Sequence, residues 1–199
     1  SWNLLTEQEK TLFARLTVFR GTFSREAAAK IAGASLGHLA MLVDKSLLRR
    51  NPSGHYEMLE VLRQYGLEKL EGRPAEEAAL KQAHAGFFIE RLAWWEDALQ
   101  GSKQKQALAE ISEDIENVRA AWQWATGNNQ FGPLAASLDS LYRFYEIRGW
   151  FQEGVEILAA LAEKIRAQGG HVTGQPFRLF YGQVVAHEGA FLYRLAAHD

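Results

Sequence analysis

The six histidines, the residues best suited to bind a metal or to transfer protons near neutral pH, are scattered along the 199 residues of this chain. There is no cysteine, which excludes disulfides, thiolate metal sites and thiol catalysis. The pair His187-Glu188 lacks the second histidine, four residues after the first, that a zinc-protease helix needs. We therefore expect no catalytic residue and no metal site, and interpret the histidines as isolated surface or boundary residues: His38, His55, His84, His171, His187 and His198.

Nucleotide chemistry would need a phosphate-binding loop. A GxxxxGK[ST] segment surrounds phosphates with backbone N–H groups and a lysine, and no segment of the chain matches it. We expect the chain to bind no cofactor and to be no enzyme. An enzyme with an unrecognised site is the least favoured interpretation.

A basic cluster, Lys45, Arg49 and Arg50, has the residue types that contact nucleic-acid phosphates. The segment before it offers little for reading bases, since its polar side chains ahead of Asp44 are Ser35 and His38. Residues 1–70 hold ten Lys/Arg and seven Asp/Glu, a charge of +3, which is low for a dedicated DNA-binding domain. We expect interdomain packing or solvated charge here, with DNA binding as the alternative.

The basic cluster adjoins a predicted β-hairpin. Asn51-Pro52-Ser53-Gly54 has turn composition, because proline presets one backbone angle and glycine accepts a positive one. The flanking runs 47–50 and 55–58 alternate partly, as short strands do. A hairpin of this size needs helices to lie on.

Predicted helices surround the hairpin. Thr6 and Glu9 form a capping box for a helix that we expect to end at Gly21. Ser24 caps a short helix to residue 32, and Ser35 caps a third whose expected core face is Leu36, Leu39, Val43 and Leu47. Helix, short helix, turn and helix make a helix-turn-helix. With the hairpin added, the pattern predicts a winged helix.

The rest of the chain reads as helix, so the predicted fold class is mainly α. Gly72-Arg73-Pro74 suits the end of one helix and the start of the next. Two mainly apolar stripes at helical spacing follow. The first consists of Leu80, His84, Phe88, Leu92, Trp95 and Leu99, and the second of Leu108, Ile111, Ile115, Val118, Trp122 and Ala125. We expect a winged-helix domain over 1–72, a helical linker over 73–127 and antiparallel helical repeats, cut short, over 128–199.

Several segments resemble a known family. The stretches LLTEQEKTLFARLTVFRGTFSREAA, LVDKSLLRR and YEMLEVLRQYGLEKL resemble the winged-helix region of bacterial STAND-class signalling NTPases. DIENVRAAWQWA and LYRFYEIRGWFQEGVEIL resemble the helical linker and first tetratricopeptide-like repeat of the same proteins. The resemblance implies a regulator, often transcriptional, whose NTPase domain lies outside this chain. It also implies two partners, which are the NTPase domain and a protein bound by the repeats. It further implies a cytoplasmic location.

The resemblance also supplies expectations for single residues. In the wider family a Met-His-Asp triplet follows the hairpin and its His contacts bound ADP, whereas this chain has Met58-Leu59-Glu60. Leucine cannot hydrogen-bond a phosphate, so we expect Leu59 to start the core stripe of its helix instead. In the repeat, Gly154 takes the small-residue position and receives large side chains of the preceding helix.

Aromatic residues are concentrated in the second half of the chain. Those that lie off the apolar stripes either pack on neighbouring helices or line a partner surface, where tryptophan and tyrosine are favoured. The candidates for the partner surface are Trp94, Trp124, Phe144 and Trp150. Because the last repeat is cut short, we expect an uncovered apolar face at Val184, Phe191 and Leu195.

Two functions follow as expectations. The first is a non-catalytic regulatory and interaction fragment, in which a winged helix relays the state of an NTPase domain and helical repeats bind a protein. The alternative is a DNA-binding winged helix with a helical dimerisation or effector module. No apolar run is long enough to span a membrane, so no membrane contact is expected.

Overall fold

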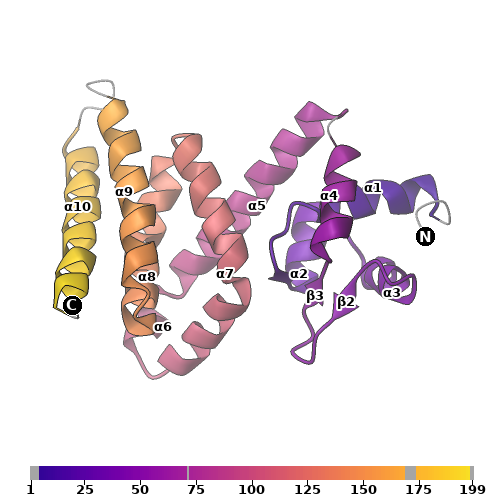
Figure 1. Ribbon diagram of the computed structural model, residues 1–199, viewed down its shortest axis with the longest axis horizontal. Helices are drawn as coiled ribbons and strands as arrows, with labels where there is room; N and C mark the ends of the chain where they lie inside the picture. The colour runs from indigo at the N-terminus through magenta and orange to yellow at the C-terminus, as the bar shows by residue number, and fades with distance from the viewer. Residues whose placement is uncertain (1–4, 71, 169–173, 198–199) are drawn as a thin grey trace. The chain divides into compact units, whose positions relative to one another are not determined.

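A computed structural model describes residues 5–70, 72–168 and 174–197 and shows a mainly α protein with one small sheet near the N-terminus (Figure 1). The predicted fold class is confirmed. The chain divides into two compact units, residues 1–88 with 112–121 and residues 89–111 with 122–199. The unit boundaries fall inside two long helices. No helix in the described ranges is long and apolar enough to cross a bilayer.

The first unit begins with three helices whose starts follow the predicted caps. Helix α1 (Glu7–Leu16) has the Thr6–Glu9 capping box. Ser24 caps α2 (Arg25–Ala27), which continues as a π-helical turn, Ala28–Ala32. Ser35 caps α3 (Leu36–Asp44), and His38 completes a capping box there. Side-chain oxygens thus satisfy the otherwise unpaired first-turn N–H groups.

A three-stranded antiparallel sheet completes the winged helix, with strand order β1-β3-β2. Strands β2 (Arg49–Arg50) and β3 (Tyr56–Glu57) form the predicted hairpin, and Gly54 adopts the positive φ of +86° that its turn requires. Strand β1 (Thr22–Phe23) pairs with β3, Phe23 opposite Tyr56. The sequence analysis did not predict β1, because a strand of two residues is too short to show the alternation of polar and apolar side chains.

Two helix predictions in this unit were wrong. Helix α1 ends at Leu16, where the Thr17 hydroxyl donates to the Ala14 carbonyl at 2.6 Å, and does not reach Gly21. Phe19 therefore lies outside the helix, yet it is buried and stacks on Phe23 at 4.3 Å. On α3 the core face is Leu39 and Leu42, and Leu36 is exposed.

Helix α4 (Glu60–Glu68) follows the hairpin and packs closely on α1. A Cβ added at Gly66 would lie 2.4 Å from Thr17 Cγ2 and 2.9 Å from Phe13 Cε1, so only glycine permits this approach. Leu59 caps α4 and is 39% exposed. The prediction that Leu59 begins a core stripe was wrong.

Three helices carry the predicted linker: α5 (Pro74–Trp94), α6 (Glu96–Gln100) and α7 (Gln104–Gly127). The first stripe is buried throughout, although the helix breaks at Trp95. The second stripe is also buried, apart from the half-buried Leu108. Residues 74–88 and 112–121 of these helices belong to the first unit and the remainder to the second.

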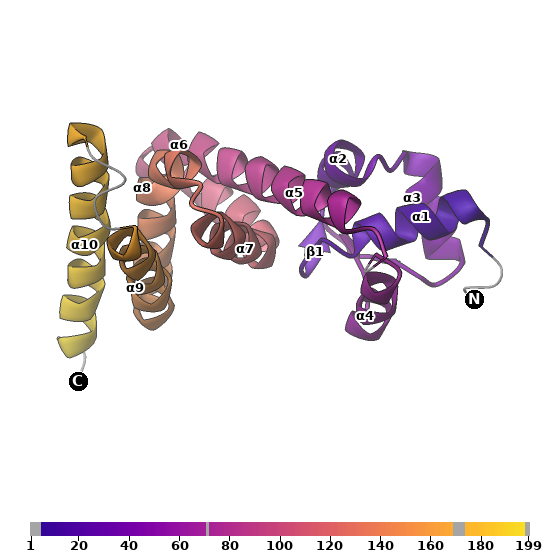
Figure 2. The same cartoon turned by 90° about the horizontal axis from the view of Figure 1, so that it is seen from above.

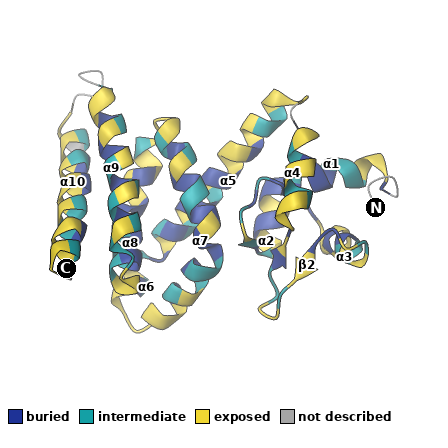
Figure 3. Cartoon of the chain, viewed as in Figure 1, coloured by how far each residue is buried: buried dark blue, intermediate teal, exposed yellow. Residues whose placement is uncertain are grey.

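In the second unit three helices succeed one another antiparallel, as Figures 1 and 2 show: α8 (Phe131–Arg148), α9 (Phe151–Ala167) and α10 (Gln175–Ala196). Gly149, with φ +70°, turns the chain between α8 and α9. Of the polar loop predicted between α9 and α10, residues 169–173 lie outside the described residues. Figure 3 shows buried residues along the facing sides of these helices.

Helices α9 and α10 meet through a glycine. A Cβ at Gly154 would lie 2.4 Å from the Phe191 ring, so the space over this glycine is filled from α10 rather than from α8 as expected. Val184 and Phe191 are buried and Leu195 is half-buried, so the prediction of a partly uncovered face was wrong for the first two of these residues.

Replacing Gly154 by alanine is expected to lower the free energy of unfolding by about 2 kcal/mol, because Phe191 must shift to relieve the clash. Chemical denaturation followed by circular dichroism measures this. Gly132→Ala, on α8 with no atom within 4 Å of the new Cβ, is the matched control and is expected to cost nothing. Equal effects at both glycines would contradict the prediction.

Candidate functional site

The candidate site lies in the first unit, where α5 and α7 dock on the N-terminal helices and sheet. Its centre is Asn117 of α7, which is fully buried. Asn117 Oδ1 accepts the Arg20 N–H at 2.8 Å and lies 3.0 Å from His84 Nε2 of α5. Asn117 Nδ2 donates to the Thr22 carbonyl at 2.7 Å. One amide therefore joins α5, α7 and the segment leading into β1.

His84 is a buried member of this site, not the isolated surface or boundary residue predicted. Asn117 Oδ1 is an acceptor, so His84 Nε2 must carry the hydrogen. Burial lowers the pKa of His84 to about 4, with the Asn117 hydrogen bond opposing the shift, so the imidazole is neutral at pH 7. The rings of Phe88 and Phe19 lie 4.7 Å and 5.8 Å from it.

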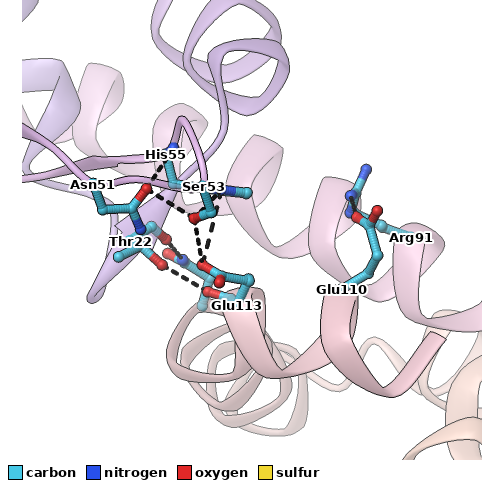
Figure 4. A network of polar contacts seen from close by, with 8 residues as sticks. Thr22, Asn51, Ser53, His55, Arg91, Glu110 and Glu113 are labelled. Carbon is cyan, nitrogen blue, oxygen red and sulfur yellow. Dashed lines mark hydrogen bonds and ion pairs between the residues drawn. The ribbon is translucent and has the colours of Figure 1, made fainter. Parts of the chain in front are cut away.

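Strand β1 and the tip of the wing also contact α7 (Figure 4). Thr22 Oγ1 donates to the Glu113 carbonyl at 2.7 Å, and Ser53 Oγ lies 3.4 Å from Glu113 Oε2. His55 Nδ1 is 3.8 Å from the same carboxylate oxygen. Asn51 Oδ1 accepts both the Ser53 hydroxyl and the His55 N–H at 2.8 Å, which fixes the turn. The wing thus presents polar groups to a helix that carries a carboxylate.

An ion pair fixes the start of α5. Arg15 Nε of α1 lies 2.6 Å from Glu76 Oε1. The hydrogen bond from Arg15 lowers the pKa of Glu76, so the pair stays charged at neutral pH. The Arg15–Glu76 ion pair and the His84–Asn117 contact hold α5 against the first unit at two points along the helix. The N-terminal part of the predicted linker therefore belongs to the same unit as the winged helix.

The basic cluster is divided by the fold. Lys45 Nζ lies 2.9 Å from both carboxylate oxygens of Glu9, and this bond lowers the pKa of Glu9. Lys45 is therefore engaged within the protein. Arg49 and Arg50 are exposed on β2, and within the described ranges neither forms an ion pair.

Helix α3 occupies the position of the second helix of a helix-turn-helix, the one that reads bases in DNA-binding proteins. Its exposed residues are mostly apolar or small: Leu36, Gly37, His38, Ala40 and Asp44. None of them is a lysine or arginine, and the negative charge of Asp44 would repel a DNA phosphate. This surface therefore lacks the side chains that most often read base edges.

The three residues of the triplet after the hairpin lie in different environments. Met58 is buried and Leu59 is exposed. Glu60 accepts two hydrogen bonds from Arg63, at 2.5 Å and 2.7 Å, which lower its pKa to about 2. Glu60 is thus a charged partner of Arg63.

The four residues predicted to line a partner surface in the second unit differ in their burial. Trp94 is 72% exposed and meets the edge of Trp95 at 4.5 Å. Trp124 and Trp150 are half-buried. Phe144 is fully buried against Tyr145 and Trp150, so including it was wrong. Nearby, Arg91 pairs with Glu110 at 2.8 Å (Figure 4).

Sequence reasoning missed Asn117, Thr22 and Glu113. A signal existed, because Asp114, Asn117 and Ala121 recur at spacings of three and four, and all three are buried. A search for apolar stripes alone passes over a polar residue on a second buried face. Of the predicted histidines, His171 and His198 lie outside the described residues. Within the described part, no three His, Asp or Glu side chains form a potential metal site.

Comparison with known proteins places this arrangement in context. The chain is 30% identical over 173 residues to proteins from Mycobacterium bovis and two strains of Mycobacterium tuberculosis. Their names give them, provisionally, as HTH-type transcriptional regulators. The matches cover 82% of this chain and 19% of each relative, so the chain corresponds to about a fifth of their length. No family model and no solved structure matches. The chain is a distant homologue of part of these regulators.

Proposed function

We propose that this chain is a non-catalytic regulatory and protein-interaction part of a STAND-class transcriptional regulator that acts in the bacterial cytoplasm. The winged helix couples an NTPase domain outside the chain to the helices that follow. Helices α8, α9 and α10 form a tetratricopeptide-like array that binds a protein partner. The distant homology with HTH-type regulators supports the regulatory context, and the segment resemblance supports the STAND class.

The observation that carries the proposal is the Asn117 site. A winged helix that acts alone on DNA needs no buried polar attachment to downstream helices. Here α5 and α7 are fastened by Asn117, His84 and the Arg15–Glu76 ion pair. These attachments support the proposal, because a winged helix that moved would carry α5 and α7 with it, as a relay requires.

A specific observation favours DNA binding as the second candidate. Arg49 and Arg50 project from the wing without ion-pair partners in the described part of the chain. Wings of this kind contact phosphates through such side chains. Against this, Glu113 lies beside the turn of the wing, and α3 exposes no cation.

Fluorescence anisotropy with mixed-sequence duplex DNA at several salt concentrations separates the two candidates. We expect no binding even at low salt, with Arg49→Ala/Arg50→Ala indistinguishable from the wild type. Lys45→Ala is the matched control, since Lys45 is held by Glu9. Tight binding that weakens steeply with salt and is lost in the double arginine variant would overturn the proposal, because phosphate contacts release counterions.

A further inference from the structure

Two arginines of the first unit have buried nitrogen atoms that bind nothing within the described part of the chain. Arg20 lies between α1 and β1, and Arg63 lies on α4. The Nη1 atom of each guanidinium is buried and donates no hydrogen bond to any described residue. Burying a charged donor without an acceptor is costly, and buried polar groups in native proteins nearly always have a partner. The two Nη1 atoms are therefore candidates for contact with a ligand.

The two arginines lie near each other because α4 packs on the end of α1. The approach is close at Gly66, where an added Cβ would lie 2.4 Å from Thr17 Cγ2. Arg63 is three residues before Gly66 and so lies on the same side of α4, while Arg20 is three residues after Thr17. Burial, and after it the charge of Arg63, lower the pKa of Arg20. Two like charges are thus held together in a partly buried position.

Glu60 balances only one of these two positive charges. Its carboxylate oxygens accept from Arg63 Nε at 2.7 Å and from Arg63 Nη2 at 2.5 Å, so one edge of that guanidinium is occupied. The Arg20 side chain forms no hydrogen bond or ion pair with any described residue. Arginine is seldom buried unless it is paired. With two positive charges and one negative charge, the cluster of Arg20, Glu60 and Arg63 has a net charge of +1 and can accept a further anion.

We propose that Arg20 and Arg63 bind a phosphate group, with the Nη1 atoms of both guanidiniums donating to its oxygens while Glu60 stays on the other edge of Arg63. Arginine suits this task because its planar guanidinium stays charged and forms strong, charge-assisted hydrogen bonds to oxyanions. A phosphate group carries a charge of about −1.5 to −2 at pH 7 and three acceptor oxygens. It can therefore accept from two guanidiniums at once and offset their excess charge.

The cluster lies at the edge of the contact between α1 and α4, where a small ligand can reach it. The side chain of Glu60 is 60% exposed and Arg20 is half-buried. The side chain of Arg63 is only 12% exposed and is fixed by Glu60. We therefore expect Arg63 to stay in place and the long Arg20 side chain to turn about its own bonds, so that its Nη1 meets the phosphate at the surface.

The main chain of Arg20 joins this site to the rest of the first unit. Its N–H donates to Asn117 Oδ1 at 2.8 Å, so one residue would contact the phosphate through its side chain and α7 through its backbone. Binding would stabilise this segment and slow hydrogen exchange of the Arg20 amide. The site needs only residues of the first unit, so it goes beyond the proposed protein partner of the helical array and does not depend on that partner.

An NMR titration of the 199-residue chain tests the proposal, with inorganic phosphate added at constant ionic strength against chloride. The amide signals of Arg20 and Arg63 are expected to shift with a dissociation constant on the order of 0.1 to 1 mM. Arg20→Met is expected to weaken binding at least tenfold. Arg49→Met removes the same charge from an exposed site on β2 and is the matched control, expected to bind as the wild type does. Repeating the titration with ADP distinguishes the source of the phosphate, since tighter binding of ADP indicates a nucleotide and equal binding indicates the phosphate alone.

Thermal unfolding distinguishes a ligand site from a structural ion pair. In chloride buffer Arg20 is a partly buried cation without a partner, so Arg20→Met is expected to raise the midpoint of unfolding by about 2 to 4 °C. Adding about 10 mM phosphate is expected to raise the midpoint of the wild type by about 3 to 10 °C and to leave that of Arg20→Met unchanged. A purely structural arginine would show neither effect.

Three outcomes would overturn the proposal. The first is the absence of shifts at Arg20 and Arg63 with both phosphate and ADP at concentrations far above the expected dissociation constant. The second is phosphate binding that Arg20→Met does not weaken, which would place the anion elsewhere on the chain. The third is a lower unfolding midpoint of Arg20→Met in chloride, because it would show that Arg20 already has a stabilising partner within the protein.

Discussion

Replacing Asn117 by alanine is expected to lower the free energy of unfolding of the first unit by about 4 kcal/mol. The change leaves the Arg20 N–H, the Thr22 carbonyl and His84 Nε2 without their partner inside the protein. Each buried group that loses its hydrogen bond costs about 1 to 3 kcal/mol, and the three are coupled through one amide. Urea denaturation followed by far-UV circular dichroism measures the loss.

A local measurement distinguishes this site from general damage. The Arg20 amide donates to Asn117, so its hydrogen exchange is expected to accelerate in Asn117→Ala more than that of amides in α9. Gln123→Ala, an exposed change on the same helix, should leave both measurements within about 0.5 kcal/mol of the wild type. A loss below about 1 kcal/mol in Asn117→Ala would show that the amide is dispensable and would remove the basis of the proposed relay.

The stability of the first unit is expected to fall by about 3 kcal/mol between about pH 6.5 and about pH 4 through His84 alone. Burial lowers the folded-state pKa of His84 to about 4, whereas the unfolded chain has the ordinary value of 6.5. Between these values the unfolded state binds a proton that the folded state does not. Stability therefore falls as pH is lowered through this window and is level above it.

His84→Gln isolates this contribution. Glutamine does not titrate and keeps an N–H that can reach Asn117 Oδ1. Measured by urea denaturation at several pH values, the difference between wild type and His84→Gln removes the contribution of carboxylates such as Glu9 and Glu60. We expect that difference to change by about 3 kcal/mol from pH 7 to pH 4. A constant difference would mean that His84 is accessible to solvent protons in the fold.

The most predictable features are those that short-range chemistry settles. The Thr6–Glu9 capping box, the Ser24 and Ser35 caps and the turn at Asn51-Pro52-Ser53-Gly54 involve residues within four positions of each other, and all occur in the structure. The apolar stripes of α5 and α7 were also predictable. Buried side chains recur at the helix period whatever they pack against.

Contacts between distant segments could not be read in this way. Whether Phe19 belongs to a helix depends on its stacking on Phe23, and whether Leu59 is buried depends on what α4 lies against. The face of α10 that stays uncovered was wrongly assigned because periodicity gives two apolar faces, Val184 with Phe191 and Leu179 with Leu192. Packing against α9 selects between them.

The sequence by itself determined the helix starts, the hairpin turn, the mainly α class and the absence of cysteine chemistry, because each follows from neighbouring residue types. Tertiary structure alone decided the candidate site. Asn117 lies 97 residues from Arg20 along the chain and 33 from His84, and hydrogen bonds at that separation exist only once the helices have packed. In the sequence, a polar helix residue that will face solvent looks the same as one that will join a buried hydrogen-bond network. Only burial distinguishes the two, because a buried donor or acceptor without a partner is costly.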